Sequence, residues 1–166
     1  MFKSVKDLTY MAMYAALFLV LDFLTLLIPF LQMPQGGSIG IGTVALLLAS
    51  YHLGPWKGLL VALVSIPLQQ FTSGLWIAGI PGLMLDYILA FGIYGLACVF
   101  PSRGSFYSGI LVTNIVRWMC HVVAGMVCYE TPFWGSVVYN TPYMVATCVV
   151  GMILVPMLHK RLSKVL

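Results

Sequence analysis

Residues 8–31 read LTYMAMYAALFLVLDFLTLLIPFL, an apolar run with a single charged residue, Asp22. A helix needs about 20 apolar residues to cross a bilayer, so this run predicts a membrane-spanning helix. The run is too long for the apolar core of a cleavable signal peptide, and it lacks a clear small-residue cleavage site. We therefore expect it to remain in the chain as a helix.

The whole chain has the composition of a membrane protein. It is 61% hydrophobic and 7% charged, with a mean hydropathy of +1.03. Such a chain cannot present a solvated surface around one apolar core. With about 20 residues per crossing, it has room for at most about six spans and for no soluble domain. We expect a single transmembrane domain over residues 1–166 in a cell membrane.

Gly, Pro and polar clusters divide the chain into apolar runs, each of which predicts a helix. The predicted fold class is an all-α membrane protein with six transmembrane helices. The expected spans are residues 8–31, 38–53, 57–72, 81–100, 105–128 and 136–158. The second and third runs are short, so either helix is expected to be broken or extended by an irregular segment.

The basic residues predict the orientation of these helices. Lysine and arginine occur near both chain ends and in the second and fourth connections, and the first, third and fifth connections contain neither. The positive-inside rule then places both termini in the cytoplasm. This distribution accounts for the net charge of +4 as a topology signal, so no nucleic-acid partner is expected.

One face of the fifth helix is polar. Asn114, Arg117, His121, Gly125 and Tyr129 recur at intervals of three or four residues, which places them on one stripe that rises toward the outer surface.

Two neighbouring helices bring further polar groups to the same outer level. Asp86 and Tyr87 lie one to two turns into the fourth helix, and Asn140 lies about one turn into the sixth, after a connection that contains Trp134. An ionisable group in hydrocarbon costs about 2.5–3.5 kcal/mol on insertion scales, so Asp86 should face inward. A carboxylate near Tyr87 and His121 has the parts to hold a small organic cation by charge and ring stacking.

Arg117 is also expected to face inward, and it is interpreted as a structural ion pair with Asp22 or Asp86. Only Asp86 is a plausible companion for His121 at the same level, so neither a metal site nor another cofactor is expected. The chain has no H-E-x-x-H motif, and Ser38 and Ser136 have no evident base beside them, which leaves no candidate catalytic residue. It also has no phosphate-binding loop for ATP. The four cysteines form no C-x-x-C pair and are expected to be packing residues.

Two further motifs are open to more than one interpretation. The turn MPQGGS (33–38) in the first outer connection suits either a simple connector or a lid, because Pro34, Gln35, Gly36, Gly37 and Ser38 all favour loop conformations. Ala12 and Ala16 lie one turn apart at the inner half of the first helix, a spacing that permits close helix approach either within this chain or to a partner.

Four motifs taken together resemble a known family. MPQGGSI (33–39), LDYILAF (85–91), RWMCHVVAG (117–125) and YNTPYM (139–144) occur in the order seen in thiamine-specific S components, the substrate-binding membrane subunits of energy-coupling factor (ECF) transporters. The resemblance covers nearly the whole chain. It implies a bundle of six helices around a vitamin pocket near the outer face, with the 33–38 loop as its lid.

The resemblance also implies roles for individual residues. It assigns thiamine binding to Asp86, Tyr87, His121, Gly125, Tyr129, Trp134 and Asn140. Asp86 stands where some members have glutamate and would face the thiazolium cation. The implied partners are thiamine, the lipid bilayer and an ECF module of two ATPase subunits and a transmembrane coupling subunit, which would dock at Ala12 and Ala16.

Other functions remain open at this level. The chain could be an S component for another small cationic or heterocyclic vitamin. A stand-alone secondary carrier would need a coupling-ion site or a continuous polar path, and the sequence shows neither in its inner half. An intramembrane enzyme or a structural assembly factor are the remaining alternatives.

Overall fold

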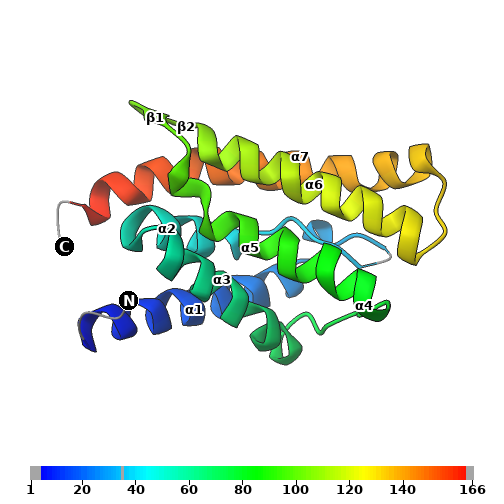
Figure 1. The fold of residues 1–166 in the computed structure, drawn as a ribbon, viewed down its shortest axis with the longest axis horizontal. Helices are drawn as coiled ribbons and strands as arrows, with labels where there is room; N and C mark the ends of the chain where they lie inside the picture. The colour runs from blue at the N-terminus through cyan, green and yellow to red at the C-terminus, as the bar shows by residue number, and fades with distance from the viewer. Residues whose placement is uncertain (1–4, 35, 164–166) are drawn as a thin grey trace.

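The computed structural model describes residues 5–34 and 36–163, which form a bundle of helices that run side by side (Figure 1). Its six helical segments are α1 (Val5–Leu26), α2 (Thr43–Leu53), α3 (Pro55–Leu68), the continuous segment Gly79–Gly95, α6 (Ser108–Cys128) and α7 (Phe133–Leu162). The segment Gly79–Gly95 comprises α4 (Gly79–Gly82), a π-helix (Leu83–Leu89) and α5 (Ala90–Gly95). Short 3-10 turns occupy Pro29–Leu31, Gln69–Phe71 and Ala97–Val99.

Each predicted apolar run forms a helix, but the boundaries differ. α1 ends at Leu26 because Pro29 restricts the residue before it, and Ile28 is extended (φ −114°, ψ 97°). α2 begins at Thr43 after an irregular segment, which confirms that the second run is a short helix with an irregular extension. α1, α6 and α7 are long and apolar enough to cross a membrane.

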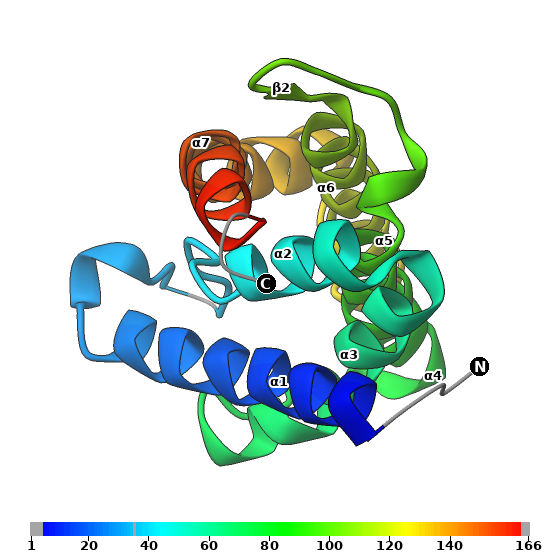
Figure 2. The same ribbon diagram turned by 90° about the vertical axis from the view of Figure 1, so that its left-hand side faces the viewer.

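α2 is the central helix of the bundle. All of its residues from 43 to 50 are buried, and it packs against α1, α3, α5 and α7 (Figure 2). A helix that is apolar on every side is stable only when every side is covered. The lack of polar periodicity in this run therefore follows from its central position.

Glycines allow two close backbone contacts around α2. A Cβ atom on Gly95 of α5 would lie 2.4 Å from the backbone of Leu59 in α3, and one on Gly109 of α6 would lie 1.9 Å from the carbonyl oxygen of Ala97. Small residues at such crossings let helix backbones touch. They bring the segment Gly79–Gly95 close to both α3 and α6.

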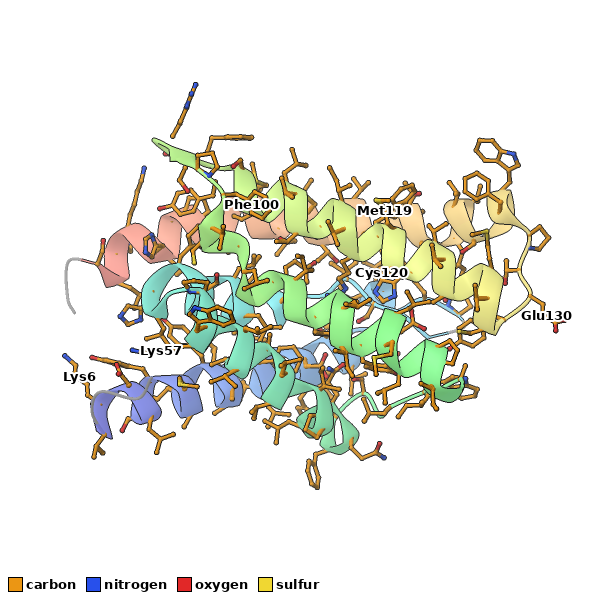
Figure 3. All side chains as sticks on the ribbon, in the orientation of Figure 1. Lys6, Lys57, Phe100, Met119, Cys120 and Glu130 are labelled. Atoms are coloured by element: carbon orange, nitrogen blue, oxygen red, sulfur yellow. The ribbon has the colours of Figure 1, made fainter. Side chains whose placement is uncertain are left out.

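The two ends of the bundle differ in charge. The end that carries both termini is named the basic end, because it holds Lys6, Lys57, Arg103, Lys160 and Arg161, which are all the described lysines and arginines except Arg117 (Figures 1 and 3). The opposite end, named the loop end, carries Glu130 and the connections after α1, α3 and α6 (Figure 3). Lys3 and Lys164 lie outside the described residues.

A small hairpin at the basic end was not predicted from the sequence. β1 (Ser102–Arg103) pairs with β2 (Phe106–Tyr107) through a turn in which Gly104 has a positive φ of 62°. The Lys160 ammonium donates a hydrogen bond to Ser105 Oγ at 2.6 Å, so α7 holds the hairpin in place. The only local signal is the short turn sequence RGS.

Candidate functional site

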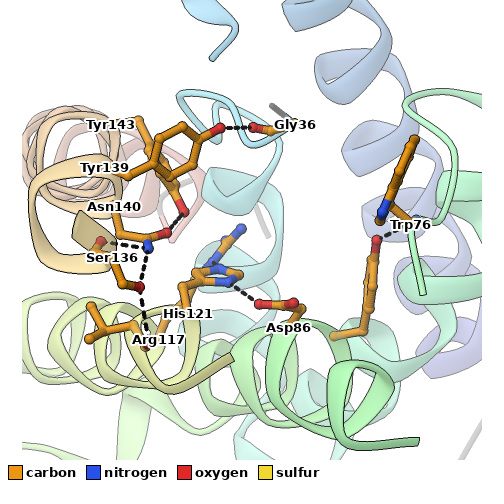
Figure 4. A network of polar contacts seen from close by, with 11 residues as sticks. Gly36, Trp76, Asp86, Arg117, His121, Ser136, Tyr139, Asn140 and Tyr143 are labelled. Carbon is orange, nitrogen blue, oxygen red and sulfur yellow. Dashed lines mark hydrogen bonds and ion pairs between the residues drawn. The ribbon is translucent and has the colours of Figure 1, made fainter. Parts of the chain in front are cut away.

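The polar stripe of α6 faces the interior and meets Asp86. Arg117 is 7% exposed, and the side chains of His121 and Asp86 are 12% and 17% exposed. His121 Nδ1 lies 2.7 Å from Asp86 Oδ1, and the Arg117 Nε–H donates to His121 Nε2 at 3.1 Å (Figure 4). The structure confirms that both charged residues face inward, and it joins them through one imidazole ring.

This chain of bonds determines the protonation of His121. The Arg117 Nε can only donate, so His121 Nε2 must present its lone pair. The ring then carries one proton, on Nδ1, and donates it to Asp86 Oδ1. His121 is therefore neutral, Asp86 is the anion and Arg117 is the cation, so the three residues together have no net charge.

The sequence-based ion-pair assignment of Arg117 was wrong. Within the described part of the chain, Arg117 forms an ion pair with neither Asp86 nor Asp22. His121 stands between Arg117 and Asp86, and Asp22 accepts hydrogen bonds from Thr72 and Ser73 instead.

Aromatic rings provide the other contacts of the Arg117 guanidinium. Its central carbon lies 4.3 Å from the ring centre of Phe91 and 5.3 Å from that of Tyr94. Ring faces attract cations, most strongly where water is excluded. Its Nη1 atom is buried without a hydrogen-bond partner among the described residues and lies near Gly40. Arg117 is thus held mainly by rings and by His121.

A π-helix presents Asp86 and Tyr87. Residues Leu83–Leu89 form one wide helical region inside the segment Gly79–Gly95. Such π-type insertions are rare and are frequent at functional sites. The Tyr87 hydroxyl accepts a hydrogen bond from the Trp76 backbone N–H at 2.7 Å, and its ring lies nearly parallel to that of Phe91. Asp86 consequently lies between Trp76 on one side and Asn140 on the other (Figure 4).

Asn140 is held by a side-chain network on α7. Its Nδ2 donates to the Ser136 carbonyl at 2.8 Å and to Ser136 Oγ at 3.2 Å, and its Oδ1 accepts from the Tyr143 hydroxyl. Ser136 Oγ in turn donates to the carbonyl of Val122 on α6 at 2.9 Å. Sequence reasoning gave no role to Ser136 or Tyr143, although both share the helical face of Asn140 by their spacing.

Gly125 serves the contact between α6 and α7. A Cβ atom placed on it would lie 2.2 Å from Ser136 Oγ. The absence of a side chain lets Ser136 reach the α6 backbone and orient Asn140. Its observed role is therefore helix packing that supports the site.

The first loop-end connection folds back onto α7. Gln32 and Ser38 form a β-bridge, and the Met33 N–H donates to the Gly37 carbonyl at 3.0 Å. The Tyr139 hydroxyl donates to the Gly36 carbonyl at 2.8 Å (Figure 4). Gly36 and Gly37 have positive φ angles of 86° and 79°, which glycine adopts without steric cost. Gln35 lies outside the described residues, and Pro34 begins the tip of this turn.

The remaining predicted residues lie outside the hydrogen-bond network of Asp86, His121 and Asn140. Tyr129 follows the end of α6, where burial and then the nearby Asp86 carboxylate raise the pKa of its hydroxyl above the usual value. Trp134 is 73% exposed and contacts Phe133, so the structure does not bring it to Asp86. Ala12 and Ala16 are exposed on α1, whereas Ala15 beside them is buried in the core.

The described residues contain no group of three or more His, Cys, Asp or Glu side chains placed to hold a metal ion. They bring together the Asp86 carboxylate, the Tyr87 hydroxyl, the Asn140 amide and several aromatic rings inside a bundle of apolar helices. Fold and site define a multi-pass membrane protein that holds these polar and aromatic groups between its helices.

Comparisons with known proteins identify the family. The model of the thiamine transporter protein family (Thia_YuaJ) matches residues 8–166. "Thiamine transporter ThiT" of Bacillus subtilis (strain 168) is 30% identical over 186 residues, which cover 98% of this chain and 96% of that protein. The chain belongs to the thiamine transporter protein family, a family of transporters rather than enzymes, and the resemblance noted in its motifs is confirmed.

Solved structures agree on the fold. ThiT from Listeria monocytogenes superposes with a TM-score of 0.79 at 21% identity, over 96% of both chains. A structure described as the S component of a bacterial ECF transporter gives a TM-score of 0.58 at 21% identity, over 96% of this chain and 94% of that one. At this level of identity, both matches establish the architecture alone.

Gly125→Ala should destabilise the protein by about 1–3 kcal/mol, because the added methyl overlaps Ser136 Oγ in a well-packed contact. Thermal unfolding in detergent measures the effect. Ser136→Ala removes the overlapping oxygen, so the double variant should lose less than the sum of the two single variants. Strict additivity would show that Gly125 does not act through Ser136.

Proposed function

We propose that this chain is a thiamine-binding S component that operates as one membrane domain over residues 1–166. The single observation that carries the proposal is the Asp86 carboxylate, held inside the bundle by neutral His121. Thiamine carries a permanent positive charge on an aromatic thiazolium ring. The curated relative from Bacillus subtilis is named for thiamine, which supports this ligand over another cationic vitamin.

The contacts of Asp86 suit a cation. An ionised carboxylate attracts a cation far more strongly in a site of low dielectric than in water. Arg117 balances the charge of Asp86, and His121 separates the two. Tyr87 and Tyr129 offer aromatic rings near the carboxylate. We assign ligand contacts to Asp86, Tyr87, His121, Tyr129 and Asn140.

The 33–38 turn is proposed as the lid. Its hydrogen bond from Tyr139 to Gly36 joins it to α7 at the residue before Asn140. One neutral hydrogen bond contributes about 0.5–1.5 kcal/mol net, which is small enough to break and form during ligand exchange. The glycines give the turn the backbone freedom that such movement needs.

Asp86→Asn should weaken thiamine binding by about tenfold or more, because a charged interaction of about 1.5–3 kcal/mol is lost. The asparagine Oδ1 can still accept the His121 proton, so the substitution removes charge and keeps geometry. Isothermal titration of the purified protein with thiamine measures the change. Asp7→Asn, which alters a carboxylate paired with Lys57 at the basic end, is the control. Equal losses in the two variants would refute Asp86 as the cation partner.

The orientation is proposed with the basic end in the cytoplasm and the loop end outside. Its support is the location of the described lysines and arginines at one end, apart from Arg117. The proposed ligand site then faces the outer medium through the 33–38 turn.

Cysteine labelling tests this orientation in whole cells. In a background with the four native cysteines replaced, Glu130→Cys should react with a membrane-impermeant maleimide, and Arg103→Cys should react only after permeabilisation. Both positions are exposed on opposite ends of the bundle. The reverse labelling pattern would invert the proposed transport direction.

An ECF module is proposed as the partner that supplies energy. The chain has no phosphate-binding loop of its own, and one of the matching folds is described as an S component of such a transporter. Ala12 and Ala16 form an exposed small-residue stretch on α1, where a partner helix can approach closely.

Ala12→Trp with Ala16→Trp should abolish most ATP-driven thiamine uptake and leave thiamine affinity unchanged, because the bulky rings obstruct docking far from Asp86. Val149→Trp with Ile153→Trp places the same rings at the same spacing on an exposed face of α7 and serves as the control. Uptake assays in cells and titration of the purified variants give the two readouts. Unimpaired uptake would exclude this face as the docking site, and uptake by the pure protein without ATP would favour a stand-alone carrier.

A further inference from the structure

The second loop-end connection, residues 69–78, is fastened to α1 by a carboxylate. We name this segment the strap. The Thr72 and Ser73 hydroxyls both donate hydrogen bonds to Oδ2 of Asp22, at 2.5 and 3.0 Å. The strap begins with a tight turn in which the N–H groups of Thr72 and Gly74 donate to the Gln69 carbonyl. Asp22 is thus engaged with a loop and, among the described residues, forms an ion pair with no basic side chain.

The later part of the strap forms a hydrogen bond with Tyr87. The backbone N–H of Trp76 donates to the Tyr87 hydroxyl at 2.7 Å, whereas the Trp76 side chain is 79% exposed (Figure 4). The strap therefore contacts the Tyr87 hydroxyl through its own backbone and not through the Trp76 side chain. Because that oxygen accepts the Trp76 hydrogen, the phenolic proton of Tyr87 remains free to be donated to another group.

α1 also supports the ring of Tyr87, through the contact of Phe18 with Phe91. Phe18 is buried against Phe91 in an edge-to-face contact, and the Phe91 ring lies parallel to that of Tyr87 at a centroid distance of 6.4 Å. Phe18 and Asp22 are one turn apart and share a face of α1. One face of α1 thus supports Tyr87 twice, through the ring by Phe18 and through the hydroxyl by Asp22 and the strap.

The presence of a carboxylate at position 22, in place of a neutral acceptor, has a physical explanation. An aspartate within an apolar helix is costly to insert, and a neutral acceptor would also satisfy two hydroxyl donors. The ionised oxygen makes shorter and stronger hydrogen bonds than a neutral one. It therefore fixes the strap more firmly than asparagine would.

We infer that Asp22 is a positioning residue for substrate binding: it anchors the strap, which orients the Tyr87 hydroxyl. The inference rests on the proposed function, because Tyr87 is taken as a ligand contact. It adds a residue of α1 to the determinants of the site. The same helix carries the exposed Ala12 and Ala16, so the strap links the proposed docking helix to the site.

Asp22→Ala tests this positioning role in two ways. In the ligand-free protein, the backbone amide of Trp76 should exchange with deuterium faster, by about tenfold, because the strap that carries this amide is no longer held in place. Thiamine affinity should fall by about three- to tenfold, mainly through faster release. Asp22→Asn should give a smaller change in both measurements. Thr9→Val, which alters an exposed hydroxyl near the start of α1, is the matched control.

The link through Tyr87 is tested by a double-mutant cycle. Tyr87→Phe removes the acceptor of the Trp76 amide and keeps the ring. In this background, Asp22→Ala should change thiamine affinity by less than about twofold, because its effect passes through the missing hydroxyl. Thr72→Val with Ser73→Ala removes the same contact from the strap side and should reproduce the faster exchange, even where Asp22→Ala fails to fold.

Three results would overturn the inference. One is unchanged exchange at Trp76 in the variants of Asp22 and of the strap. Another is an equal loss of affinity from Asp22→Ala with and without the Tyr87 hydroxyl. The third is an exchange increase of the same size in Thr9→Val. If the unmodified protein binds no thiamine, the proposed function fails, and the exchange measurements still decide whether Asp22 orients Tyr87.

Discussion

The bond chain from Arg117 through His121 to Asp86 is the constraint on which the interior depends. Two opposite charges inside an apolar bundle stabilise each other only if their hydrogen-bonding groups find partners. Here one neutral imidazole forms a hydrogen bond with each of them, and the rings of Phe91 and Tyr94 cover the cation. Replacing the imidazole by an apolar group would leave both charges without this partner. The carboxylate is therefore available to a cationic ligand without being an isolated charge.

The polar groups can meet because the helices around them pack with their backbones in contact. Gly125 admits Ser136, and Ser136 accepts hydrogen bonds from Asn140 and so orients its side chain. Gly95 and Gly109 bring the segment that contains Asp86 against its neighbours. In a membrane, apolar side chains gain little by leaving lipid, so close packing and interhelical hydrogen bonds hold helices together. The same contacts that stabilise this bundle position its functional groups.

Much of this arrangement could be predicted from the sequence, because apolar length and helical spacing are read directly from residues. The six helices, the inward stripe of α6 and the approach of His121 to Asp86 follow from those two rules. Trp134 was assigned to the site from family resemblance, yet it precedes Asn140 by six residues, a spacing that separates the two by about 120° around a helix and so places them on different faces. The exposed Trp134 in the structure agrees with that geometry.

Other features had no signal in the sequence. A π-helix differs from an α-helix by one residue per hydrogen-bonded turn, and the run around Asp86 is compatible with both. Arg117 had two candidate carboxylates, and only the folded structure shows that His121 and the strap hydroxyls reach them first. The role of Gly125 likewise depends on which helix faces it. Which of several candidate partners a side chain contacts therefore depends on the folded structure.

The division of α1 into two faces gives the structure a physical route between its ends. The exposed face carries Ala12 and Ala16, and the buried face carries Phe18 and Asp22, which contact the surroundings of Tyr87. A helix is stiff along its axis, so a tilt imposed at one end displaces side chains at the other. The contacts at Phe18 are apolar and tolerate sliding, whereas those at Asp22 are directional and weaken when donor and acceptor move apart. A displacement of α1 should therefore release the strap before it disturbs the aromatic core, so the ligand site can loosen while the bundle stays folded.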